Sequence, residues 1–161
     1  MSAALIRPAR EEEVDFLTRM LGWAVRWQSD ELDDGVLDEP EFARYVENWG
    51  RPGDTALVAE SADGTLVGAA WYRLFDVEEP GYGFVDAATP EVAIGVEPGH
   101  RGAGIGRALL ETLAERARGE GFQTLSLAVE QDNPALRLYE QVGFQRVKQG
   151  KDDWTLVLLL D

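Results

Sequence analysis

The stretch that most restricts how this chain can fold is a short apolar strand that leads through a glycine-rich turn into a helix. Residues 91–96 read EVAIGV, and residues 101–106 read RGAGIG, with three glycines in six positions. Glycines let backbone N–H groups point into one concavity, and the first turn of a helix adds unpaired donors and a positive dipole end. The segment therefore predicts an anion-binding turn into which a pyrophosphate fits, with added charge from Arg101 and Arg107. A turn that only reverses the chain is the alternative.

Three phosphate-binding glycine patterns can be compared with this turn, and none of them matches. The nucleoside-triphosphatase loop ends in Gly-Lys-Ser/Thr, whereas Arg107 and Ala108 follow Gly106. The dinucleotide fingerprint needs a small residue three places after its second glycine, but Arg107 or Leu109 stands there, depending on the register. The kinase loop lies between two strands, and here a helix follows. The turn therefore belongs to another class of phosphate site.

Hydrophobic periodicity predicts a mixed order of strands and helices along the chain. Strands are expected at residues 4–9, 91–96, 122–129, 144–149 and 154–160, and a hairpin over residues 54–75 turns at 62–64. Helices are expected at residues 10–27, 38–50, 104–118 and 133–143, and residues 76–90 are expected to be mostly loop. The hairpin favours antiparallel pairing, and the later alternation favours parallel neighbours. We therefore expect a single α/β (α+β mixed) domain over residues 1–161.

Composition and charge exclude several classes of function. A net charge of −15 opposes nucleic-acid binding, because that binding depends on basic residues that meet phosphates. The chain has no cysteine and a single histidine, so no metal site is expected, and His100 is assigned to the surface of the turn. No run approaches the roughly 18 apolar residues of a membrane span, and the first residues lack the pattern of a signal peptide. We therefore expect a cytoplasmic protein with no membrane partner.

The glycine turn and a later segment together resemble the GNAT superfamily of N-acyltransferases. The family motif, Arg/Gln-x-x-Gly-x-Gly/Ala after a central strand, matches at Arg101, Gly104 and Gly106, and NPALRLYEQVGF at residues 133–144 is similar to the second family motif. The order of elements agrees along nearly the whole chain. The resemblance implies a mixed, mostly antiparallel sheet of about six or seven strands, splayed at a slot for acetyl-CoA and flanked by about four helices. The cofactor-binding residues that it implies are Ile94, Val96, Arg101, Gly102, Ala103, Gly104, Ile105, Gly106, Arg107 and Asn133.

Two of these positions also carry a structural expectation. Gly95 favours a β-bulge that splays the sheet. Asn133 and Pro134 are typical of a helix N-cap followed by proline at the first helical position. The resemblance adds that the backbone at Ile94 and Val96 pairs with the pantetheine arm, and that the Asn133 side chain touches it.

The resemblance also implies two catalytic residues. Tyr139 matches the general acid that protonates the departing coenzyme A thiolate, because its ordinary pKa of about 10 exceeds the thiol value of about 8.5. Packing beside Leu136 is the alternative role. Glu91 matches a glutamate that removes a proton from the amine directly or through water, and Asp86 is the second candidate. An ordinary carboxylate that faces solvent at a strand end would explain Glu91 as well.

The function that these residues predict is acetyl transfer from acetyl-CoA to a primary amine in a ternary complex. A catalytically silent module that binds acyl-CoA is the alternative. The acidic stretch at residues 30–41 suggests a cationic small-molecule or peptide acceptor, unless it is only a solvated surface. Trp27, Trp49 and Trp71 are core residues or walls of the acceptor pocket. The apolar run WTLVLLL at residues 154–160 is either a homodimer edge or an internal strand.

Overall fold

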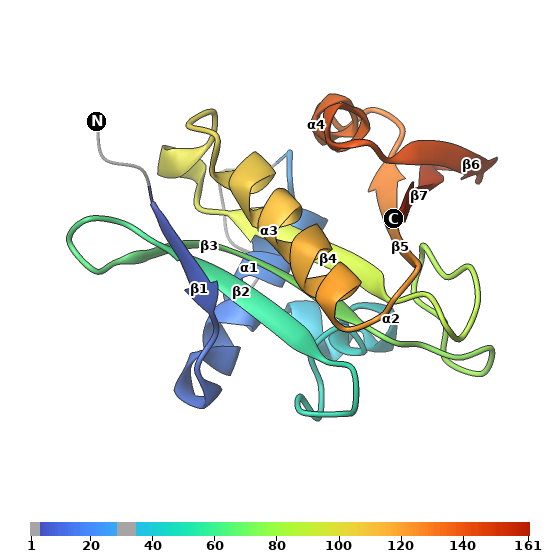
Figure 1. Ribbon diagram of the computed structural model, residues 1–161, viewed down its shortest axis with the longest axis horizontal. Helices are drawn as coiled ribbons and strands as arrows, with labels where there is room; N and C mark the ends of the chain where they lie inside the picture. The colour runs from blue at the N-terminus through green and yellow to red at the C-terminus, as the bar shows by residue number, and fades with distance from the viewer. Residues whose placement is uncertain (1–3, 29–34) are drawn as a thin grey trace.

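One seven-stranded sheet organises the part of the chain that the computed structural model describes, residues 4–28 and 35–161 (Figure 1). Its strands are β1 (Leu5–Pro8), β2 (Thr55–Glu60), β3 (Leu66–Arg73), β4 (Glu91–Val96), β5 (Thr124–Glu130), β6 (Gln145–Gln149) and β7 (Asp153–Leu159). They lie in the order β1-β2-β3-β4-β5-β7-β6, and every neighbouring pair is antiparallel except β4 with β5. The expected mixed, mostly antiparallel sheet is confirmed.

Helices cover both faces of this sheet. A 3-10 turn at Glu11–Glu13 leads into α1 (Val14–Val25), whose buried residues belong to one apolar cluster, while those of α3 (Ile105–Gly119) belong to a second. On β2, Val58 joins the α1 cluster and its neighbours Leu57 and Ala59 join the α3 cluster. Successive strand residues point to opposite faces, so α1 and α3 lie on opposite sides of the sheet, as Figure 1 shows. The last helix, α4 (Ala135–Val142), packs beside α3.

The two parallel strands β4 and β5 are joined at one end only. Glu91 pairs with Ser126, and the Ser126 N–H donates to the carbonyl of Pro90 at 3.0 Å. From there β4 stays paired with β3 as far as Val96, and β5 stays paired with β7 as far as Glu130. The facing edges of β4 and β5 therefore separate, which is the predicted splay.

Gly95 does not form the expected bulge. It pairs with Ala69 in regular register, and the register shifts of the sheet lie at Ala59/Glu60 and Arg146/Lys148 instead. A Cβ atom at Gly95 would collide with the backbone carbonyl of Met20 in α1. Glycine is required there because a helix backbone approaches the strand.

The second helix is much shorter than the predicted range 38–50. Here α2 (Pro40–Ala43) is a single turn after a 3-10 turn at Val36–Asp38, and residues 44–48 continue as turns. The buried guanidinium of Arg73 donates to the carbonyls of Arg44 and Glu47, at 3.0 and 2.6 Å, and pairs with Asp54 at 2.7 Å. Those carbonyls bind a side chain from β3, so the backbone around them departs from a helix.

The C-terminal apolar run forms β7, which lies inside the sheet between β5 and β6. The interpretation of this run as a dimer edge is therefore wrong, because both of its edges are already paired. Within the described ranges, none of the helices combines the length and the apolarity that crossing a bilayer requires.

Candidate active site

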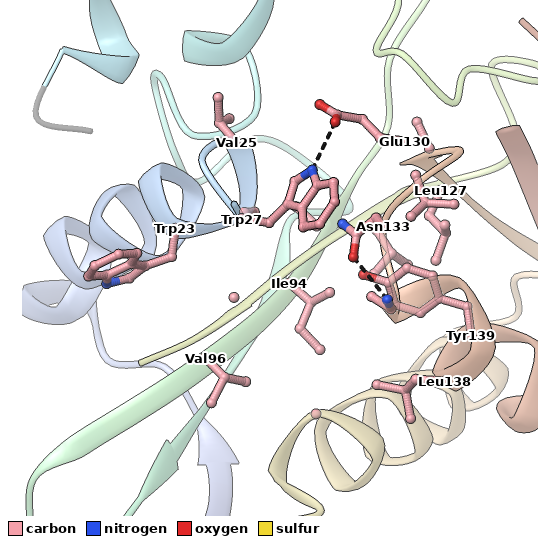
Figure 2. A pocket seen from close by; sticks show the side chains of 18 of the residues that line it. Trp23, Val25, Trp27, Ile94, Val96, Leu127, Glu130, Asn133, Leu138 and Tyr139 are labelled. Atoms are coloured by element: carbon pink, nitrogen blue, oxygen red, sulfur yellow. Dashed lines mark hydrogen bonds between the residues drawn. The ribbon is translucent and has the colours of Figure 1, made fainter. Parts of the chain in front are cut away.

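A cavity of about 1140 Å³ opens where β4 and β5 separate. Its walls come from both strands, from the C-terminal end of α1, from the turn before α3 and from α4. Figure 2 shows Ile94 and Val96 on β4, opposite Tyr139 and Leu138 on α4. Trp23 and Trp27, from α1 and the turn after it, lie on the other side of β4 in this view. The parted strands thus produce a cavity that several elements line, rather than a simple surface groove.

The predicted anion-binding turn lies along this cavity. Gly102 and Gly104 both have positive φ, at 81° and 83°, a backbone conformation that favours glycine. No atom lies within 4 Å of where a Cβ would stand at either position, so both sites are free of neighbouring protein atoms. Gly104 precedes the first residue of α3, whose first N–H groups have no acceptor within the helix. The turn therefore presents free donors to the space beside it.

The two arginines of the turn have different surroundings. The Arg101 Nε donates to the carbonyl of Val96 at 3.1 Å, and its guanidinium lies 5.6 Å from the centre of the Trp23 ring. Arg107 lies 3.6 Å from Glu111 in an exposed pair on the first turns of α3. Arg101 is therefore positioned by β4 and α1, whereas Arg107 is partly neutralised by its own helix.

The remaining cofactor candidates differ in how they meet the cavity. Ile94, Val96, Gly106 and Asn133 line it, as do the turn residues named above, but Ala103 is exposed and outside the lining. A Cβ at Gly106 would stand 3.2 Å from the Leu138 side chain, so its small size allows α3 and α4 to approach. The Asn133 Oδ1 accepts the Ala135 N–H at 2.9 Å. The α4 helix starts at Ala135, one residue later than predicted, and this contact still caps its first turn.

Tyr139 combines the two roles that the sequence left open. It packs against the Phe144 ring, with centroids 6.2 Å apart, and only 8% of its surface is exposed, yet it lines the cavity. Burial raises the pKa of its phenol to about 12. A phenol with that pKa stays protonated at neutral pH and can donate a proton.

Glu91 is a buried carboxylate rather than a solvent-facing one. It begins β4 at the point where the two strands separate, with 2% of its surface exposed, and it lines the cavity. Burial raises its pKa to about 7, although hydrogen bonds from Tyr45 and from the Gly83 N–H act in the opposite direction. Its Oε1 atom has no hydrogen-bond partner among the described residues. A carboxylate with a pKa near neutrality and one free oxygen has the properties of a general base.

Sequence reasoning missed the residues that hold Glu91 in place. The Tyr45 hydroxyl donates to Glu91 Oε2 and accepts the Tyr82 N–H at 2.9 Å, and the Gly83 N–H donates to the same carboxylate oxygen at 3.0 Å. A Cβ at Gly81 would collide with the Glu91 carboxylate. The Gly-Tyr-Gly repeat at residues 81–83 was the available signal, because two glycines around one residue allow a loop to press against a buried group.

The other candidates are divided between cavity, core and surface. Asp86 is exposed and outside the cavity lining, and its carboxylate accepts the Ala88 N–H at 2.9 Å within its own loop. Trp71 is fully buried and Trp49 contacts Arg73, so neither belongs to the cavity wall, whereas Trp27 does. The exposed His100 also contributes to the lining. Of the acidic stretch 30–41, residues 30–34 lie outside the described residues.

An open mixed sheet that parts between two parallel strands, with a glycine turn beside the gap, defines the class of acyltransferases. The chain belongs to the GNAT acetyltransferase family, since the model described as "Acetyltransferase (GNAT) family" matches residues 18–144. The expectation of an acyltransferase enzyme of this family is thereby confirmed.

Curated relatives and solved structures agree with this assignment. Mycothiol acetyltransferases from Thermobispora bispora and Beutenbergia cavernae are 38% and 36% identical over 86% and 65% of this chain. The chain spans only 44% and 32% of their lengths. A ribosomal-protein-alanine N-acetyltransferase from Brucella melitensis is 31% identical, with a TM-score of 0.71 over 97% of this chain and 99% of that one. A putative acetyltransferase from Salmonella typhimurium with its cofactor acetyl-CoA is 28% identical, with a TM-score of 0.72 over 99% and 95%.

Proposed function

We propose that this protein transfers an acetyl group from acetyl-CoA to a primary amine by direct attack in a ternary complex. The observation that carries the proposal is that one cavity is lined by an anion-binding turn, a protonated phenol and a buried carboxylate with a pKa near 7. These are the three chemical functions that amine acetylation needs.

The cofactor candidates fit an acyl-CoA in charge and in space. Gly102 and Gly104 leave open space beside free N–H groups, and Arg101 adds a fixed positive charge. The unpaired edge of β4 offers backbone groups to an extended ligand arm near Ile94 and Val96. The cavity exceeds the roughly 300–1000 Å³ of ordinary small-molecule pockets, which suits a site for two substrates. The similar Salmonella typhimurium structure carries acetyl-CoA.

Each catalytic side chain has a separate task. When bound, acetyl-CoA supplies a thioester whose carbonyl carbon accepts the amine while its C–S bond breaks. Glu91 takes a proton from the amine through its free oxygen, directly or through one water. Tyr139 donates its phenolic proton to the departing sulfur and regains one from solvent. Backbone N–H groups on the open edge of β4 stabilise charge on the carbonyl oxygen.

Steady-state kinetics with an amine panel test this proposal. Coenzyme A release and the mass of the acetylated amine are followed for the wild type, Glu91→Gln and Tyr139→Phe. Both variants should bind acetyl-CoA as the wild type does and lose about 10²- to 10⁴-fold in kcat. Tyr72→Phe is the matched control, because it removes a buried hydroxyl outside the cavity lining and should keep its activity.

The same assay separates the proposal from a catalytically silent acyl-CoA-binding module. Such a module would bind acetyl-CoA and acetylate no amine in the panel, and Tyr139→Phe would leave every measured property intact. That combination of results would overturn the proposed activity. The relatives named above are described as acting on different acceptors, mycothiol or a ribosomal-protein alanine, so the acceptor must be sought in this chain's own cavity.

A further inference from the structure

The two ends of the cavity carry opposite charges. The end at the glycine turn holds Arg101, Arg107 and His100. The other end, where β5 finishes and β7 begins, holds three carboxylates close together in the sequence and the sheet, and one basic residue, Lys151, among the lining residues. These carboxylates are Glu130, Asp152 and Asp153. An anionic ligand end would be attracted to the first region and a cationic one to the second.

The acidic end contains a like-charge pair that is costly to the fold. Glu130 on β5 is directly opposite Asp153 on β7, and residues opposite one another on antiparallel strands share a face. Burial raises the pKa of Asp153, and the charges of Asp152 and Glu130 add to that effect. None of the ion pairs recorded between described residues includes these three carboxylates. Opposed carboxylates without a cationic partner would gain stability from a bound cation.

An independent feature of the same cavity indicates where an amine would sit. Glu91 is buried, lines the cavity and has an oxygen without a hydrogen-bond partner among the described residues. The charge of Asp153 also acts on this carboxylate, so the two groups face a common space. Four residues of β5 separate Ser126, the partner of Glu91, from Glu130, which is about 13 Å along the strand. The two acidic points are therefore separated along one channel.

Aromatic rings line the walls between these points. The Trp27 Nε1 donates to Glu130 Oε2 at 2.8 Å, as Figure 2 shows, and Phe42 lies 5.6 Å from Tyr82 between ring centroids. All three rings line the cavity, and Tyr82 follows the loop that holds Glu91. Aromatic faces attract cations and also contact methylene chains. The walls therefore suit an aliphatic chain between two positive groups.

We propose that the acceptor is an aliphatic diamine or polyamine, whose reacting amine lies at Glu91 and whose second ammonium group is bound by Glu130, Asp152 and Asp153. This inference rests on the proposed acetyl transfer and adds the substrate class. The second ammonium group neutralises the opposed carboxylates, while the chain between the two nitrogens contacts Trp27 and Tyr82.

Matched acceptors test the proposal directly. Acetylation is measured with 1,3-diaminopropane, 1,4-diaminobutane, 1,5-diaminopentane and spermidine, each compared with propylamine, butylamine or pentylamine at low ionic strength. The diamines should exceed the monoamines by about tenfold or more in kcat/KM. The variants Glu130→Gln and Asp153→Asn should reduce that ratio, chiefly through KM, and added salt should reduce it as well. Glu115→Gln makes the same charge change at an exposed site on α3 outside the lining and should leave the ratio unchanged.

The outcomes separate this inference from the proposed function. If diamines and monoamines react equally well, or if the three variants change the ratio alike, the inference is overturned and acetyl transfer stands. A strong preference for peptides that begin with a free amine and carry no second cation would also overturn it. If no amine is acetylated while acetyl-CoA binds, the proposed function itself fails. Thermal unfolding of each variant identifies any loss that comes from misfolding, and Asp152→Asn then replaces an unfolded variant in the series.

Discussion

At the scale of single residues, Glu91 is the clearest case of a side chain held at a cost to the fold. Burial raises the pKa of its carboxyl from 4.5 to about 7. Between these pH values the folded chain binds more protons than the unfolded chain, so this group lowers the stability as pH rises. This is the reverse of an ion-paired carboxylate, which stabilises the fold at neutral pH. A carboxyl with this pKa is useful as a base because it changes charge near the working pH.

Replacing this carboxyl should therefore stabilise the protein while it removes activity. The raised pKa corresponds to about 3 kcal/mol at pH 8, at 1.36 kcal/mol per pH unit. Glu91→Gln should show a free energy of unfolding that changes by about that amount less than the wild type between pH 5 and pH 8. Urea unfolding at both pH values measures it. An identical pH dependence in the two proteins would show that Glu91 is not held in an unfavourable charged state.

Residue-level prediction from the sequence reached the groups that belong to motifs and missed their supports. Glu91 and Tyr139 have positions fixed relative to a strand and a helix cap, and both line the cavity. Tyr45 lies 46 residues from Glu91 in an irregular segment, so no local pattern connects the two. Contacts between distant irregular segments depend on tertiary packing, which sequence periodicity does not contain.

At the scale of elements, the close approach of α1 to β4 shapes one wall of the cavity. The helix backbone at Met20 meets the strand at Gly95, and only a residue without a Cβ permits that contact. Ile94 and Val96, which flank this glycine, pack against the α3 side instead. The alternation keeps β4 covered on both faces while its β5-facing edge stays open.

Gly95→Ala should therefore be destabilising although it adds a single methyl group. We expect a loss of about 2 kcal/mol or more, because backbone must move to admit the new atom. The matched control is Gly119→Ala at the last residue of α3, where a Cβ meets nothing within 4 Å and alanine favours the helix. Thermal unfolding should place the two variants on opposite sides of the wild type. Equal stability of Gly95→Ala and wild type would mean that α1 and β4 are not in close contact.

Elements with strong periodicity were predictable, and those shaped by buried polar contacts were not. The α3 helix and the β2–β3 hairpin appear where the sequence predicts them, because each has a continuous apolar pattern and a glycine-marked turn. The predicted helix at 38–50 is shortened because Arg73, from a different element, binds its carbonyl groups. An interaction of that kind leaves no periodic trace in the segment that it alters.

At the scale of the whole molecule, the parting of β4 and β5 connects the fold to the function. One registered pair holds the strands together at Glu91, and the open edges beyond it produce a cavity with a positive and a negative end. The order of elements and the glycine turn predicted this gap, since the parallel pair had to lie beside the turn. The charge of the second end was not predicted, because Glu130 and Asp153 are brought together by strand pairing alone.

The central claim is that the gap between β4 and β5 is the acetyl-CoA site, and a crystal structure of the protein with acetyl-CoA tests it most directly. The account predicts electron density for the pyrophosphate against the N–H groups of residues 102–107 and for the pantetheine arm along the open edge of β4. The thioester should point toward the end of the cavity that contains Glu91. Density for the cofactor at another surface, with the gap closed by side chains or by β5, would contradict the account.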